Sequence, residues 1–252
     1  MSENTGTLTV RVPGYPTPIQ FADWTHDELY HTIQYAGTNG NEVQAFIGAQ
    51  GSPIPNGARV LTEVDTNIPR SGDNGLSEGW ESLIYSIQVQ VVREWCSGAA
   101  GAGAAAATLL SASRPAHVGG DDATIINGGV LFDFLRKTFV RFTVNQKVQS
   151  EGPAEKYPQG SGIYAQGVTT NLEVANNGVP SPRDARAFVL PIWLRPNISF
   201  VCRFRPQAAL GSAPAGVAGT YPDVWSGQAG TGTSMGFDVR VALIGLVKRP
   251  VT

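Results

Sequence analysis

The chain has 252 residues, of which 42% are hydrophobic and only 15% charged, and its formal net charge is −2. Two cysteines are too few for a disulfide framework, no secretory signal pattern opens the sequence, and no run of about 18 apolar residues predicts a membrane span. The length suffices for a buried core, while a charged fraction well below the roughly 25% of ordinary soluble domains indicates a surface that partners cover.

The first third of the sequence predicts short strands separated by turns. Alternating apolar and polar residues predict strands at Thr7–Val12 and Ile19–Trp24, whereas the polar and aromatic segment His26–Tyr35 favours a short helical turn. Two more strands are predicted at Glu42–Gly48 and Ala58–Val64, on either side of a Gly/Pro-rich turn.

The longest predicted strand, Glu81–Trp95, is followed by a Gly/Ala-rich segment that reads as a long loop. One face of this strand carries Leu83, Tyr85, Ile87, Val89 and Val91, and Ile84 interrupts the other face. Leu131–Lys137 reads as a helical turn and Thr138–Val148 as a clean strand.

The last third continues the pattern of strands and long loops. Ser150–Gly167 reads as a Pro/Gly loop and Gly167–Ala175 as a strand. Phe188–Arg205 holds two strands joined at Pro196, which cannot donate to a ladder and therefore marks a corner or an edge. Phe237–Val247 is the final strand.

About ten strands and no helix of more than a few turns predict an all-β fold. Eight of the strands are enough for two packed four-stranded sheets, a jelly-roll β-sandwich, with a single roll favoured over a double one. We expect one domain over residues 1–252, with loop insertions at about 98–129, 150–167 and 206–236. Loops of this length are unusual in an isolated domain, so we expect contacts between copies to order them.

Two short motifs resemble a cofactor-binding site and a catalytic nucleophile, but the predicted elements around them do not fit either function. The dinucleotide-like pattern at Gly101, Gly103 and Ala106 begins five residues after its strand, where a tight turn is required. The pattern G-x-S-x-G around Ser234 has a Gly-rich loop before it and a strand after it, whereas a nucleophile elbow needs a strand before it and a helix after it.

No metal site is predicted either. His26 and His31 are five residues apart, whereas zinc ligands on one helical face are four apart. The pair Asp121 and Asp122 reads as a loop turn or, at most, a weak cation site. We therefore predict no catalytic, cofactor-binding or metal-binding residues, and a protein that is not an enzyme.

Charge is distributed unevenly along the chain. Residues 1–80 hold nine acids and three bases, and residues 131–252 hold seven acids and thirteen bases. This asymmetry predicts complementary faces between copies, or one face toward an anionic surface. Arg outnumbers Lys fourteen to four, which is typical of interfaces or of a GC-rich genome. The first ten residues contain no base, so we predict no sequence-specific grip on nucleic acid.

The style of strands and loops over most of residues 80–252 resembles that of jelly-roll capsid proteins of icosahedral bacterial viruses. The resemblance is carried by Phe139–Val148, the turn at 176–183, the strand–corner–strand unit Phe188–Arg205 and the final segment Phe237–Pro250. It implies loops that tile a shell and no catalytic residues.

We therefore expect a structural virion protein, made in the host cytoplasm, that self-assembles into an icosahedral capsid. Its expected partners are copies of itself and other virion proteins, with peripheral contact to an inner layer. The alternative is a carbohydrate-binding or receptor-binding β-sandwich module of a phage, since exposed Trp side chains can form sugar platforms. The candidate interface residues are Trp193, Arg195, Arg203, Arg205, Tyr221 and Trp225.

Overall fold

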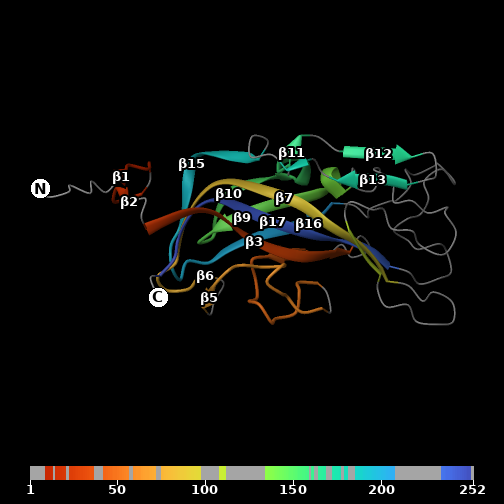
Figure 1. The fold of residues 1–252 in the computed structure, drawn as a ribbon, viewed down its shortest axis with the longest axis horizontal. Coiled ribbons are helices and arrows are strands. Elements are labelled where there is room, and N and C mark those ends of the chain that lie inside the picture. Colours follow the sequence, from red (N-terminus) through yellow and green to blue (C-terminus); the bar gives the residue numbers. More distant parts are fainter. Residues whose placement is uncertain are drawn as a thin grey trace, which may run out of the picture.

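A computed structural model gives the fold of the chain. It describes residues 9–13, 15–20, 23–36, 42–56, 59–71, 75–97, 108–111, 134–158, 160–161, 164–168, 172–176, 179–180, 185–207 and 234–250. These segments are mostly β, and their longer strands form two four-stranded antiparallel paths, consistent with a β-sandwich (Figure 1).

The first sheet has the order β15-β7-β17-β3. Its strands are β3 (Trp24–Ala36), β7 (Glu81–Ser97), β15 (Arg186–Leu194) and β17 (Ser234–Lys248). The short β8 (Thr108–Ser111) pairs with the far end of β7. The long central strands β7 and β17 stay paired from Glu81 to Ser97, so they form the rigid spine of this sheet.

The second sheet has the order β10-β9-β16-β4. Its strands are β4 (Val43–Ala45), β9 (Thr138–Val144), β10 (Lys147–Pro153) and β16 (Phe200–Pro206). Burial alternates residue by residue along β9 and β16, so each of these strands turns one face to the core and the other to solvent. The solvent-facing row of this sheet carries the candidate site described below.

Among the described residues, four pairs of short strands form separate two-stranded sheets. They are β1 (Thr9–Val10) with β2 (Ile19–Gln20), β5 (Arg70–Ser71) with β6 (Gly75–Leu76), β11 (Gly160–Ser161) with β14 (Val179–Pro180), and β12 (Tyr164–Val168) with β13 (Leu172–Asn176). The β1–β2 pair and the β12–β13 hairpin lie at opposite ends of the long axis (Figure 1). A 3₁₀ turn, η2 (Ala154–Lys156), follows β10.

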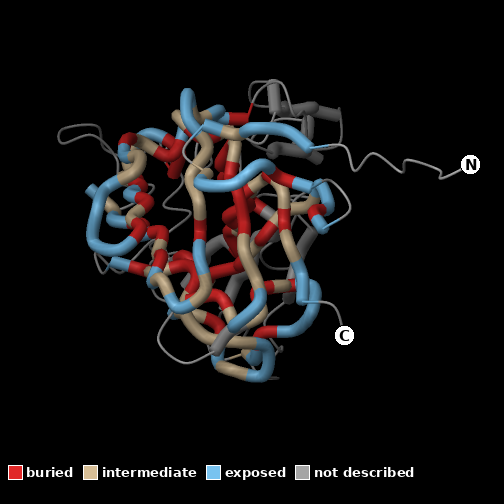
Figure 2. Tube along the Cα trace, turned by 90° about the vertical axis from the view of Figure 1, so that its left-hand side faces the viewer, coloured by how far each residue is buried: buried red, intermediate tan, exposed pale blue. Residues whose placement is uncertain are grey.

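One large hydrophobic core joins the inward faces of both sheets. Ile33, Val89 and Val241 from the first sheet and Phe142 and Cys202 from the second are all fully buried in it. Figure 2 shows these buried stretches running through the centre of the molecule, with exposed chain around them. Residues from distant parts of the chain therefore share one core.

A bulge in β7 changes which side chains reach that core. Ser86 pairs with Ile244 and Ile84 pairs with Gly245, so Tyr85 has no partner on β17. Ile84 consequently enters the main core, whereas Leu83 packs in a smaller cluster on the outer face with Ile19 and Trp24. The predicted placement of Leu83 and Tyr85 on the same face as Ile87, Val89 and Val91 was wrong, because the bulge shifts the alternation by one residue.

Several predicted elements differ from the structure. His26–Tyr35 forms most of β3 and is not a helical turn. The predicted strand at 58–64 is a turn-rich loop in its described part, with only a single bridge from Val60 to Pro53. Gly167–Ala175, predicted as one strand, includes parts of two strands, β12 and β13, which pair antiparallel.

The expected insertions have different outcomes. Segment 150–167 contains the end of β10, η2, β11 and most of β12, so it is more regular than the predicted loop. Strand β8 interrupts segment 98–129, and residues 134–137 form the expected helical turn. The rest of 98–129, and 208–233 with Tyr221 and Trp225, lie outside the described residues. Within the described part, no helix is long and apolar enough to span a bilayer.

Candidate functional site

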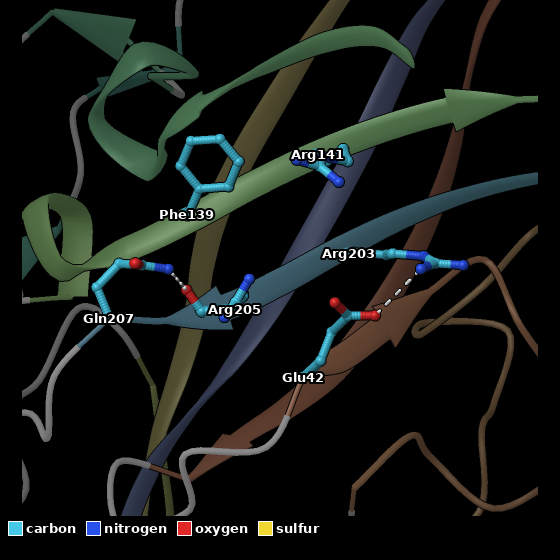
Figure 3. A pocket seen from close by; sticks show the side chains of 6 residues that line it. All are labelled: Glu42, Phe139, Arg141, Arg203, Arg205 and Gln207. Atoms are coloured by element: carbon cyan, nitrogen blue, oxygen red, sulfur yellow. Dashed lines mark hydrogen bonds and ion pairs between the residues drawn. The ribbon is translucent and has the colours of Figure 1, made fainter. Parts of the chain in front are cut away.

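The outer face of the second sheet carries a shallow hollow of about 240 Å³, which we call the arginine hollow. Strand β9 supplies Phe139 and Arg141, and β16 supplies Arg203 and Arg205. Glu42, just before β4, and Gln207, just after β16, complete its lining. Figure 3 shows these side chains on neighbouring strands around a common opening.

The register of the strands brings like charges together in this hollow. Arg203 lies directly opposite Arg141 across the β9–β16 ladder, and Arg205 lies opposite Phe139. Like charges directly opposite in an antiparallel pair destabilise the sheet. Two arginines in this register therefore need negative charge nearby to offset their repulsion.

Two glutamates balance part of this charge. Arg141 Nε lies 2.9 Å from Glu151 Oε2, and Arg203 Nη1 lies 3.5 Å from Glu42 Oε1. All four side chains are between 36% and 49% exposed, so these are solvent-screened pairs that contribute little stability. Arg205 has no carboxylate partner within the described segments, which leaves the hollow with a net positive charge.

Trp193 and Arg195 form a second, separate group at the end of β15. Trp193 Nε1 donates to Glu81 Oε2 over 2.9 Å, and Tyr15 Oη donates to the same oxygen over 3.1 Å. The Tyr15 and Trp193 rings meet edge to face, and the Arg195 guanidinium lies 5.0 Å from the centre of the Trp193 ring. Burial and the nearby Glu81 carboxylate raise the pKa of Tyr15 to about 12.

The structure thus divides the four described candidate interface residues into two pairs. Arg203 and Arg205 share the arginine hollow on the second sheet, and Trp193 and Arg195 share the aromatic group on the first. In this second pair the Trp193 ring already makes contacts within its own chain. A role for either pair in subunit contacts stays a prediction.

A loop that the sequence did not single out also presents charge. Arg59 makes two contacts to Asp65, of 2.6 and 2.8 Å, and a third of 2.8 Å to Asp238 on β17. The Asp65 and Asp238 side chains are only 5% and 1% exposed. Burial opposes ionisation of Asp65, but hydrogen bonds from Arg59 and Thr62 outweigh it and lower the pKa to about 2.

This network holds a segment whose side chains are exposed except for that of Leu61, residues 60–64, which we call the acidic tip. Tyr30 Oη donates to the Glu63 carbonyl over 2.6 Å, and Arg240 Nη2 donates to the Val64 carbonyl over 2.7 Å. The Val60 and Val64 side chains are 51% and 60% exposed, and Glu63 is exposed between them. The only sequence signal for this feature was the excess of acids in the first third of the chain.

His31 and Ser234, from two of the motifs considered above, both lie in strands of the first sheet. His31 is fully buried in β3, and its Nε2 lies 2.7 Å from the Ile47 carbonyl. Ser234 is the first residue of β17. Among the residues that the structure describes, no three His, Cys, Asp or Glu side chains gather as metal ligands. Asp121 and Asp122 lie outside these residues, as do Gly101, Gly103 and Ala106.

Comparison of the chain with family models, with curated proteins and with solved structures finds no match.

Proposed function

We propose that this chain is a structural virion protein, a single jelly roll that self-assembles into the shell of an icosahedral phage. The pairing of its strands carries the proposal. The first long strand, β3, pairs with the last, β17, and the next inward pairs are β4 with β16 and β7 with β15. The innermost pair is β9 with β10.

Such nested pairing is what a long hairpin gives when it rolls up into two sheets. In chain order the eight strands of the two four-stranded paths belong to the first, second, first, second, second, first, second and first sheet. This order supports a jelly roll, which viral capsid proteins, lectins and cupins use. The step from this fold to a capsid is an argument by analogy, because one fold can serve several functions.

Surface chemistry favours a shell over the other uses of the fold. Only 15% of the residues are charged, and three arginines gather on the open face of one sheet. Arginine is enriched at protein interfaces, because its planar fork pairs with carboxylates and stacks on rings. Many weak contacts of this kind add up in a closed shell.

The test is the state of association of the purified chain. Light scattering after size exclusion, followed by negative-stain electron microscopy over a range of concentrations, should show shells, sheets or large rings. A monomer at every concentration would contradict the proposal. A small oligomer whose melting temperature rises with sugars would support the alternative, a carbohydrate-binding module.

A further inference from the structure

The arginine hollow and the acidic tip are complementary in charge and in apolar content. The hollow combines Arg141, Arg203 and Arg205 with the Phe139 ring, and the tip presents Glu63 between two exposed valines. Glu63 has no side-chain hydrogen bond or ion pair within the described residues. The hollow also contains Glu42, which pairs with Arg203, so Arg205 is the cation available to a carboxylate from another copy.

We propose that the acidic tip of one copy of this chain docks in the arginine hollow of the next copy, with Glu63 as the carboxylate that the arginines bind. The proposal rests on the proposed function and names the contact through which assembly proceeds. A carboxylate in the hollow would give charge-assisted hydrogen bonds to Arg205, which has no carboxylate partner within the described segments, beside Arg141 and Arg203, which pair with Glu151 and Glu42. Val60 and Val64 would cover Phe139.

The acidic tip is already held in shape before it docks. The Glu63 and Val64 carbonyls are anchored by Tyr30 and Arg240, and the base of the loop is anchored by the Arg59–Asp65 pair. A preorganised loop loses little conformational entropy on binding, so even a small contact can contribute to association.

The geometry of this contact is head to tail. The tip belongs to the loop between β4 and β5, and the hollow belongs to the exposed face of the second sheet, so the two surfaces of one contact are different. Contacts of this heterologous kind generate rings when the rotation closes. Rings of subunits are the building units that a closed shell needs.

The deciding experiment is a charge swap, read by light scattering. Glu63→Arg alone, and Arg203→Glu/Arg205→Glu alone, should each weaken association roughly tenfold or more. The combined variant Glu63→Arg/Arg203→Glu/Arg205→Glu should assemble again, because every copy then carries reversed charges on both surfaces. Glu78→Arg and Arg136→Glu are the matched controls, since both change exposed charges outside the two surfaces, and they should assemble like the wild type.

Salt supplies a second measurement. Raising salt from roughly 0.05 M to roughly 0.5 M should weaken assembly of the wild type and should affect the neutral variant Arg203→Gln/Arg205→Gln much less. The neutral variant also keeps the test decisive if charge reversal prevents folding, which circular dichroism checks.

The outcomes separate the two proposals. If the wild type assembles and the hollow variants assemble equally well, or if the combined variant fails to recover, the docking contact is wrong while the virion proposal stands. If the wild type stays monomeric under all conditions, both proposals fall.

Discussion

At the scale of single residues, Asp65 links the stability of the fold to pH. Its carboxylate is almost fully buried and is held by Arg59 and by the Thr62 backbone and hydroxyl groups. Its pKa of about 2 in the folded chain lies below the ordinary value of 3.8. The stabilisation is therefore complete above about pH 4 and is lost as the pH falls toward 2.

We expect the free energy of unfolding to drop by about 2 kcal/mol over that acid range through Asp65 alone. Denaturant titrations at several pH values measure the drop. The variant Asp65→Asn should be less stable at neutral pH and should lose this part of the acid dependence. Glu78→Gln, which removes an exposed carboxylate, is the control. If the free energy of unfolding of Asp65→Asn fell by the same amount at low pH as that of the wild type, the role of this carboxylate would be contradicted.

Gly245 is a second residue whose identity the backbone dictates. A Cβ atom there would lie 1.8 Å from the Leu83 carbonyl oxygen, because the β7 bulge brings the two backbones together. We expect Gly245→Ala to destabilise the fold by about 3 kcal/mol or more, since neither backbone segment can move without breaking the ladder.

Gly51→Ala is the matched control for this substitution. Gly51 has a left-handed φ of +86° but no atom within 4 Å of an added Cβ, so only backbone strain of about 1 kcal/mol is expected. Thermal unfolding of both variants gives the comparison. Equal losses at the two positions would show that contact with Leu83 does not matter.

At the scale of elements, the β1–β2 pair is attached to the first sheet through Glu81. Tyr15, close to this pair, and Trp193 on β15 donate to one oxygen of that carboxylate. We expect Glu81→Ala to cost about 2 kcal/mol, because it removes two hydrogen bonds to a charged acceptor. Hydrogen exchange at the Val10 amide should accelerate, while exchange at Val241 in the centre of the sheet should not. Equal acceleration at both would indicate global unfolding instead of local release.

The same scale shows what the sequence can predict and what it cannot. The alternation of Phe200–Arg205 predicts a strand that the structure confirms, because β16 is buried on one face only. Thr138–Val148, predicted as one strand, ends as a strand at Val144, since the chain turns at Asn145 and Gln146 and returns as β10. Strand β3 was missed, since His31 occupies a core position between Leu29 and Ile33. Its hydrogen bond to the Ile47 carbonyl is a contact across the fold that no local pattern reveals.

The candidate site also depends on strand pairing that the sequence does not reveal. The sequence singled out Arg203 and Arg205, but their neighbour Arg141 comes from a strand about sixty residues away, and only the register places it opposite Arg203. The buried Asp238 likewise accepts a hydrogen bond from Arg59, which is 179 positions away in the sequence. Strand periodicity predicts which residues face outward, and strand pairing decides which of them meet.

At the scale of the whole molecule, one core couples the two sheets. Cys202 on β16 is fully buried in the same cluster as Ile33 on β3 and Val241 on β17. Burial raises the pKa of its thiol and closes it to reagents. Because both sheets enclose this core, its opening requires their separation, so Cys202 should report the unfolding of the entire sandwich.

We expect a Cys96→Ser variant, whose remaining thiol is Cys202, to react with a thiol reagent roughly a thousandfold or more slowly when folded than when unfolded. The free energy of opening obtained from labelling should equal that from circular dichroism, as expected if the sheets unfold in one step. Lys147→Cys in the same background is the control, because this exposed position lies on β10 of the same sheet and should label quickly. Fast labelling of Cys202 in the folded chain, with circular dichroism unchanged, would mean that the second sheet opens independently of the first.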